Sequence, residues 1–83
     1  MDDDKKLFKF IDYGEIVFNI KDIVDKRKLS VNKIVKRTGL HHQVVTRYCS
    51  GNIRRYDGDV LARLCCVLEC ELSDIMYYKS KSN

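Results

Sequence analysis

The sequence contains no proline, so no position in its 83 residues forces a break in a helix. It also lacks any apolar run long enough to cross a bilayer as a helix. Three aspartates follow Met1, where a secretory signal would have a basic start and an apolar stretch. We therefore expect one helical domain with no membrane partner, located in the cytoplasm.

The four cysteines lack the spacing of a metal site. There is no Cys-x-x-Cys pair, and adjacent residues such as Cys65 and Cys66 leave a helix about 100° apart. A chain without a secretory signal is also not expected to carry a disulfide framework. We expect small apolar core residues rather than ligands, and hence no metal or other cofactor, at all four positions: Cys49, Cys65, Cys66 and Cys70.

Enzyme patterns are missing as well. His41 and His42 have no Asp, Ser or Cys at a spacing that indicates a nucleophile and its base. No glycine-rich phosphate-binding loop occurs. We predict no catalytic residue, and no small-molecule ligand.

Acidic residues are absent from a 31-residue stretch between Lys26 and Tyr56, which holds nine Lys and Arg residues. The formal net charge of the whole chain is only +4, so the positive charge is concentrated in this stretch. A patch of one sign on a small domain favours a polyanionic partner, either nucleic acid or a membrane surface. The alternative is that these Lys and Arg residues only keep the surface soluble. Nine cations in 31 residues make that alternative less favoured.

Helical periodicity begins at residue 20. Three apolar residues there have the 0, 3, 4 spacing of one buried helical face: Ile20, Ile23 and Val24. Asn19 precedes them as a suitable N-cap. Ser30 is a suitable N-cap for a second helix, which Gly39 ends because glycine accepts the positive φ found there. The sequence thus predicts helices over about 20–29 and between Ser30 and Gly39.

Three more helices follow. One is expected over about 41–49, and a basic loop separates it from the next, for which Asp57 is a good N-cap. The apolar residues of that next helix form the strongest amphipathic pattern in the chain: Val60, Leu61, Leu64, Cys65 and Leu68. Ser73 can cap a last short helix that buries Ile75 and Met76.

Residues 7–19 are aromatic and β-branched, and a turn signal, Asp12-Tyr13-Gly14, lies in their middle. This pattern favours a short hairpin with strands near 7–11 and 15–19. A lone hairpin is marginal in water, so it should pack on the helices or pair with a further strand, for which Tyr77 and Tyr78 are candidates. Packing within the monomer and contact with a second copy both remain open for its apolar side chains: Phe8, Phe10, Ile16 and Phe18.

Two motifs stand in order in the second half of the chain: Tyr-Cys-Ser-Gly at 48–51, and Leu-Glu-Cys-Glu-Leu-Ser-Asp-Ile-Met at 68–76. With these motifs, residues 20–78 resemble a Cro/cI-type (Xre-type) helix-turn-helix domain. The first resembles the Leu-x-Asn-Gly that ends the family's recognition helix, and the second its closing Leu-x-Cys-x-x-x-Asp-Leu-Leu. Within the bihelical unit, four positions carry the apolar, glycine, apolar, apolar pattern of the family: Ile34, Gly39, Leu40 and Val45. Four residues depart from that pattern: Val35, His41, Tyr48 and Gly58.

The resemblance implies a mainly α fold, a five-helix lambda-repressor-like domain of the small single-domain branch. Residues 1–19 would be an N-terminal extension with a short β-hairpin or strand, and residues 79–83 a polar tail. The resemblance further implies that the 41–49 helix enters the major groove of double-stranded DNA, while the preceding helix lies across the backbone.

In that arrangement the start of the 41–49 helix and its next turn face the bases. Four polar residues are the candidates for base contact: His42, Gln43, Thr46 and Arg47. Glutamine can hydrogen-bond both N6 and N7 of adenine, and arginine both O6 and N7 of guanine. Four other residues fit backbone phosphates: Ser30, Lys33, Arg54 and Arg55. Arg54 or Arg55 could instead enter a minor groove.

These observations predict a sequence-specific double-stranded DNA-binding transcriptional regulator. We expect a repressor that acts as a homodimer on a two-fold operator. The alternative is a helix-turn-helix-fold protein-interaction module, such as an antitoxin-like or anti-repressor partner, which the aromatic N-terminal segment favours and the acid-free run disfavours. Nonspecific nucleic-acid binding is a third hypothesis.

Overall fold

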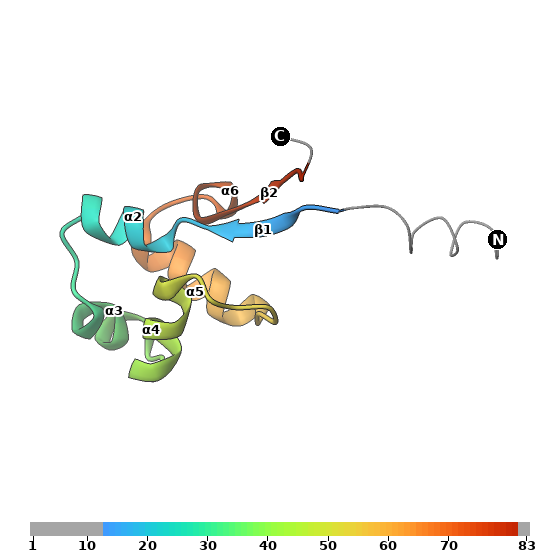
Figure 1. Cartoon of the computed structure of the whole chain (residues 1–83). Coiled ribbons are helices and arrows are strands. Elements are labelled where there is room, and N and C mark those ends of the chain that lie inside the picture. The colour runs from blue at the N-terminus through green and yellow to red at the C-terminus, as the bar shows by residue number, and fades with distance from the viewer. Residues whose placement is uncertain (1–12, 82–83) are drawn as a thin grey trace.

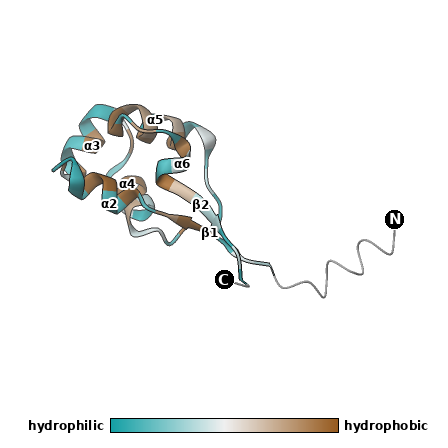
Figure 2. Cartoon of the chain, turned by 90° about the horizontal axis from the view of Figure 1, so that it is seen from above, coloured by the Kyte–Doolittle hydropathy of each residue, from teal (hydrophilic) through white to brown (hydrophobic). Residues whose placement is uncertain are grey.

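The computed structural model describes residues 13–81, and this part of the chain is mainly helical, as expected (Figure 1). It contains five helices and a two-stranded antiparallel ribbon. The elements follow one another in this order: β1 (Glu15–Phe18), α2 (Ile20–Lys26), α3 (Val31–Thr38), α4 (His42–Ser50), α5 (Gly58–Leu68), α6 (Leu72–Ile75) and β2 (Met76–Lys79). The helices pack around one core, with α3 at one end of the domain and the ribbon at the other (Figures 1 and 2).

The core is built from the apolar faces that the sequence periodicity predicts. In Figure 2 apolar and polar segments alternate along α2 and α3, as expected for helices with one buried face. The buried apolar residues come from all five helices: Ile20, Val24, Ile34, Val45, Tyr48, Leu61, Leu64, Leu68 and Ile75. Val60 and Cys65, which belong to the predicted face of α5, are only partly buried at the edge of this core.

Local capping explains where α3 begins and ends and where α5 begins. The Ser30 hydroxyl accepts a hydrogen bond from the Lys33 amide at 3.2 Å, and the Asp57 carboxylate accepts one from the Asp59 amide at 2.7 Å. Both predicted N-caps are therefore confirmed. Gly39 ends α3 with φ of 76°, a conformation that glycine adopts without a steric penalty.

Helix α2 is shorter than predicted because its C-terminus closes early. Lys28 adopts a positive φ of 54°, and its amide donates to the carbonyl of Asp25 at 3.1 Å. The Leu29 amide then donates to the carbonyl of Val24 at 3.1 Å, which completes a Schellman motif and brings Leu29 onto the core. The helix consequently ends at Lys26 rather than near residue 29.

Two other predicted caps do not form. Asn19 stands at the start of α2, but its side chain accepts no capping bond. Its side-chain amide donates to the carbonyl of Asp74 at 3.5 Å, and its backbone N–H donates to the carbonyl of Ile75 at 2.8 Å. The prediction of Ser73 as the cap of the last helix is wrong, because the N-cap is Glu71, two residues earlier, which forms a capping box with Asp74. Met76, predicted to be buried in that helix, is partly buried and belongs to β2.

The ribbon pairs the predicted 15–19 strand with the C-terminal tyrosine segment. Ile16 lies opposite Tyr78, and Phe18 lies opposite Met76. Phe18 packs on the core within the monomer, with its ring edge-to-face against Tyr56 at a centroid distance of 5.3 Å. The other expected strand, near 7–11, lies outside the described residues.

Gly14, from the predicted turn, lies directly against the end of β2. A Cβ atom at this position would be 1.8 Å from the carbonyl oxygen of Lys79, so only glycine allows the two backbones to approach so closely. The Gly14 amide also donates to the hydroxyl of Tyr78 at 2.9 Å. Together these contacts fix the position where the chain enters the ribbon.

Candidate nucleic-acid interface

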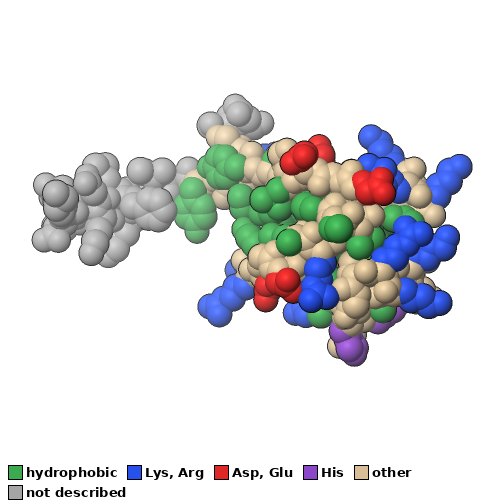
Figure 3. Space-filling model, turned by 180° about the vertical axis from the view of Figure 1, so that it is seen from behind, with side chains coloured by type: hydrophobic (Ala, Val, Ile, Leu, Met, Phe, Trp, Pro, Cys, Tyr) green, Lys and Arg blue, Asp and Glu red, His purple; other side chains and the backbone are tan. Residues whose placement is uncertain are grey.

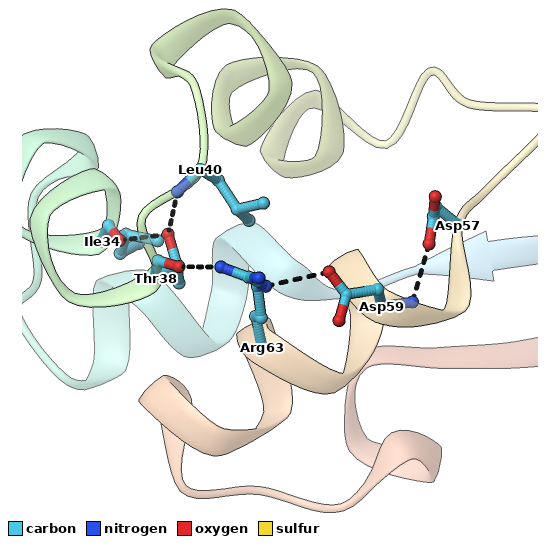
Figure 4. Close-up of polar contacts among 6 residues, drawn as sticks. All are labelled: Ile34, Thr38, Leu40, Asp57, Asp59 and Arg63. Carbon is cyan, nitrogen blue, oxygen red and sulfur yellow. Dashed lines mark hydrogen bonds and ion pairs between the residues drawn. The ribbon is translucent and has the colours of Figure 1, made fainter.

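Helices α3 and α4 form a bihelical unit joined by a three-residue turn. Thr38, the last residue of α3, donates its hydroxyl hydrogen to the carbonyl of Ile34 at 2.6 Å (Figure 4). The same hydroxyl oxygen accepts from the Leu40 amide at 3.1 Å, so one buried side chain stabilises the end of α3 and the turn. With Gly39 in the left-handed conformation, the chain reverses tightly enough for α4 to pack against α3.

Helix α4 is capped by an unusual residue. Nδ1 of His41 accepts a hydrogen bond from the Gln43 backbone amide at 3.3 Å, so histidine fills the N-cap role that Ser, Thr, Asp or Asn usually has. This bond requires a ring nitrogen with a free lone pair. Gln43 is thereby held at the start of the helix, with its side chain exposed.

The outer face of α4 is polar and the inner face is apolar. Val45 and Tyr48 are buried in the core, whereas Val44 is only partly buried at its edge. All four predicted base-contacting residues are exposed, and together with Ser50 they line one shallow hollow: His42, Gln43, Thr46 and Arg47. The structure therefore brings the whole predicted set together on one face, as the i, i+4 spacing requires.

The four predicted phosphate-contacting residues lie on two elements beside α4. Ser30 and Lys33 are exposed at the N-terminus of α3, whose free amides suit an anion. Arg54 and Arg55 are exposed in the loop between α4 and α5. Arg55 shares a second hollow with Arg47, whereas the other three lie outside both hollows.

Tyr48, which departs from the family pattern, holds the end of the loop between α4 and α5 through a hydrogen bond. Its ring is buried, and its hydroxyl oxygen accepts a hydrogen bond from the Asp57 amide at 2.9 Å. An aliphatic residue could fill the core at this position but could not accept the bond. The loop that carries Arg54 and Arg55 is therefore tied directly to α4.

Charge is unevenly distributed over the surface. In the view of Figure 3 the histidines and many Lys and Arg side chains lie on one half, and hydrophobic side chains gather on the other. The exposed hydrophobic residues of the ribbon include Ile16, Tyr77 and Tyr78. The two histidines at the start of α4 thus lie on the same half as many of the basic side chains, as the acid-free stretch predicts.

Comparison with known proteins identifies the family. The model of the Cro/C1-type helix-turn-helix (HTH) DNA-binding domain matches residues 19–81. The chain belongs to this family. Over 65 residues it is 31% identical to the uncharacterized HTH-type transcriptional regulator YozG of Bacillus subtilis, a match that covers 78% of this chain and 77% of that protein.

Solved structures share the fold of this Cro/C1-type domain. A Bacteroides fragilis protein assigned to DNA binding superposes with a TM-score of 0.66, over 76% of this chain and 100% of its own. The transcriptional regulator VanUg superposes with a TM-score of 0.64, over 87% of this chain and 95% of its own. Both are 14% identical to this chain, so the likeness concerns the fold alone.

Two residues of the Cro/C1-type unit were not predicted from the sequence. Ser50 joins the hollow on α4, and its position one turn after Thr46 was the available signal. Arg63 of α5 donates to the Thr38 carbonyl at 2.7 Å, and its signal was the i, i+4 spacing from Asp59.

The expectation of core residues at all four cysteines is wrong at Cys66, which is exposed, and the other three are only partly buried. Burial raises the pKa of the Cys49 thiol and also that of the Cys70 thiol, so both stay protonated at neutral pH. Among residues 13–81, no three His, Cys, Asp or Glu side chains are grouped so that they could hold a metal ion. In the same part of the chain, no helix has the length and apolar character needed to cross a membrane.

Proposed function

We propose that the protein is a sequence-specific double-stranded DNA-binding transcriptional regulator that reads the major groove with α4. One observation carries the proposal: four exposed polar side chains share one face of α4 while the opposite face is buried. A helix arranged in this way can insert its polar face between the DNA backbones. Its N-terminal residues then reach the base edges.

The side chains on that face suit direct readout. Gln43 can pair with N6 and N7 of adenine, and Arg47 with O6 and N7 of guanine, each through two hydrogen bonds. His42 and Thr46 lie beside them in the same hollow and offer further donors and acceptors. The chemistry supports preference for particular base pairs rather than simple attraction to DNA.

Backbone phosphates are expected to hold the domain in register. Ser30 and Lys33 lie at the N-terminus of α3, the helix that packs beside α4. Arg54 and Arg55 add basic side chains in the loop between α4 and α5. A domain fixed in this way occupies its site and excludes other proteins from it. Occupancy alone is enough for repression, so a repressor is the role that we assign.

The phosphate role of Lys33 has a measurable consequence. Lys33→Gln should reduce the slope of log K against log salt by about 0.9, because one phosphate contact and its released counterion are lost. Lys79→Gln is the matched control, since Lys79 is an exposed lysine of β2 at the other end of the domain. Titrating a labelled duplex at several salt concentrations measures both slopes. Equal slopes for the two variants would remove Lys33 from the interface.

Repression on a two-fold operator calls for a homodimer, and we assign its contact to the ribbon. Ile16 and Tyr78 are paired across the strands and remain exposed, although Phe18 on the same face packs on the core. Covering this apolar surface with its copy would be favourable. Ile16→Asp should give a monomer in light scattering, and Leu72→Asp, which alters an exposed apolar residue of α6, should not. A dimer that survives Ile16→Asp would place the contact elsewhere.

The same exposed apolar surface favours one other function, a protein-interaction module with a helix-turn-helix fold. Such a module would bind a protein through the ribbon, leaving the polar face of α4 without a nucleic-acid partner. Retention of the domain by immobilised duplex at low salt separates the two functions. Binding supports the DNA-binding regulator, and no binding supports the interaction module.

A further inference from the structure

Arg63 connects α5 to the turn between α3 and α4 (Figure 4). Its Nη1 atom donates to the carbonyl oxygen of Thr38 at 2.7 Å, and its Nε atom donates to the Asp59 carboxylate at 2.9 Å. The side chain of Arg63 is 47% exposed, so these contacts lie at the surface rather than in the core. Asp59 therefore orients the guanidinium, and the guanidinium holds the turn.

Thr38, whose carbonyl accepts the bond from Arg63, also stabilises the turn between α3 and α4 with its hydroxyl. Thr38 is the only buried polar residue in the described part of the chain, and its hydroxyl already bonds Ile34 and Leu40. Its carbonyl belongs to the last turn of α3, where helical carbonyls lack intrahelical partners and attract cations. Arg63 supplies both the hydrogen bond and the positive charge.

The guanidinium also lies over the glycine of the turn. A Cβ atom at Gly39 would stand 3.4 Å from Nη1 of Arg63, at van der Waals contact. Since the guanidinium is a rigid planar fork, fixing two of its donors limits the distance and the angle between α5 and the turn. Leu40 is followed after one residue by His42, the first residue of α4.

We propose that Arg63 is a positioning residue for DNA reading, which sets the orientation of α4 against α5 through the Thr38 carbonyl. The inference rests on the proposed function, because it assumes that α4 contacts bases. Arg63 itself need touch no base or phosphate. Its loss should misplace Gln43 and Arg47 together while leaving their chemistry intact.

Arg63→Gln tests the proposal with Arg27→Gln as the matched control. Arg27 also donates from Nη2 to a carbonyl near a helix end, that of Glu69 at 3.0 Å, but this carbonyl lies far from the turn, at the C-terminus of α5. Neither arginine belongs to the core, so both variants should fold. Arg63→Lys keeps the charge but lacks the fork, and an intermediate effect is expected.

Two readouts are needed. The first is DNA-free: residual dipolar couplings of the α4 amides relative to those of α5 should change in Arg63→Gln and stay unchanged in Arg27→Gln. The second is the ratio of affinities for a duplex enriched from a random library and for a scrambled duplex at one salt concentration. This ratio should fall roughly fivefold or more in Arg63→Gln, as for loss of one good base contact, while the salt slope stays unchanged.

The outcomes distinguish a failure of the positioning role from a failure of the proposed DNA-binding function. A salt slope reduced by about 0.9 in Arg63→Gln would make Arg63 a phosphate contact and overturn the positioning role. If the α4 couplings of Arg63→Gln equal those of the wild type, and the wild type still prefers the enriched duplex, the positioning role is overturned but the proposed function is not. A wild-type protein that binds no duplex would overturn the proposed function, and the couplings would then show separately whether Arg63 orients α4.

Discussion

Replacing Arg47 by alanine is expected to weaken binding to the preferred duplex by about 1–3 kcal/mol, a factor of about five to 150. The guanidinium of Arg47 is exposed on the outer face of α4, where it can pair with O6 and N7 of one guanine. Alanine keeps the helix but removes both donors. Fluorescence anisotropy with the preferred and a scrambled duplex at equal salt measures the change.

The control for Arg47→Ala must separate base reading from loss of charge. Lys33→Ala removes one positive charge from the N-terminus of α3, so it should weaken binding to both duplexes by a similar factor. Arg47→Ala should weaken binding to the preferred duplex more than to the scrambled one. If the two variants lose affinity in the same proportion on both duplexes, Arg47 acts only as a charge.

The largest stability effect is expected at Leu64. This residue of α5 is 0% exposed, at the centre of the core that positions α3 and α4. Leu64→Ala should lower the free energy of unfolding by about 2–5 kcal/mol, because the lost methyl groups leave a cavity that the core fills only partly. A small domain has about 5–15 kcal/mol in total, so the variant should be close to unfolding.

Leu72→Ala is the matched control for Leu64→Ala. Leu72 is 50% exposed on α6, and a surface substitution of this kind usually changes stability by at most about 0.5 kcal/mol. Urea denaturation followed by circular dichroism measures both variants. Similar losses at the two leucines would show that the core does not lie where the structure places it.

Features specified by neighbouring residues were predictable from the sequence. Ser30 and Asp57 each cap a helix through an amide two or three residues away, and Gly39 provides the positive φ at the end of α3. The family resemblance indicated which helix would face the bases, and helical spacing placed its polar side chains on one face. Arg47 and Gln43 could therefore be grouped before their positions were known.

Features that depend on distant residues were not predictable in the same way. Asn19 has the right side chain for an N-cap, but the side-chain amide donates instead to the carbonyl of Asp74, 55 residues further on. The contact between Arg63 and Thr38 joins a side chain to a backbone carbonyl 25 residues away, and a carbonyl has no signature in the sequence. The partner of β1 was open for the same reason, since strand pairing is decided by tertiary packing.

The central claim is that α4 reads base sequence in double-stranded DNA. Selection of duplexes from a random library by the full-length chain, at several salt concentrations, tests it most directly. The account predicts one enriched motif, arranged as two half-sites related by two-fold symmetry, and its enrichment should be lost in Arg47→Ala. Binding without any enriched motif would contradict sequence-specific reading, and no binding at low salt would contradict DNA binding itself.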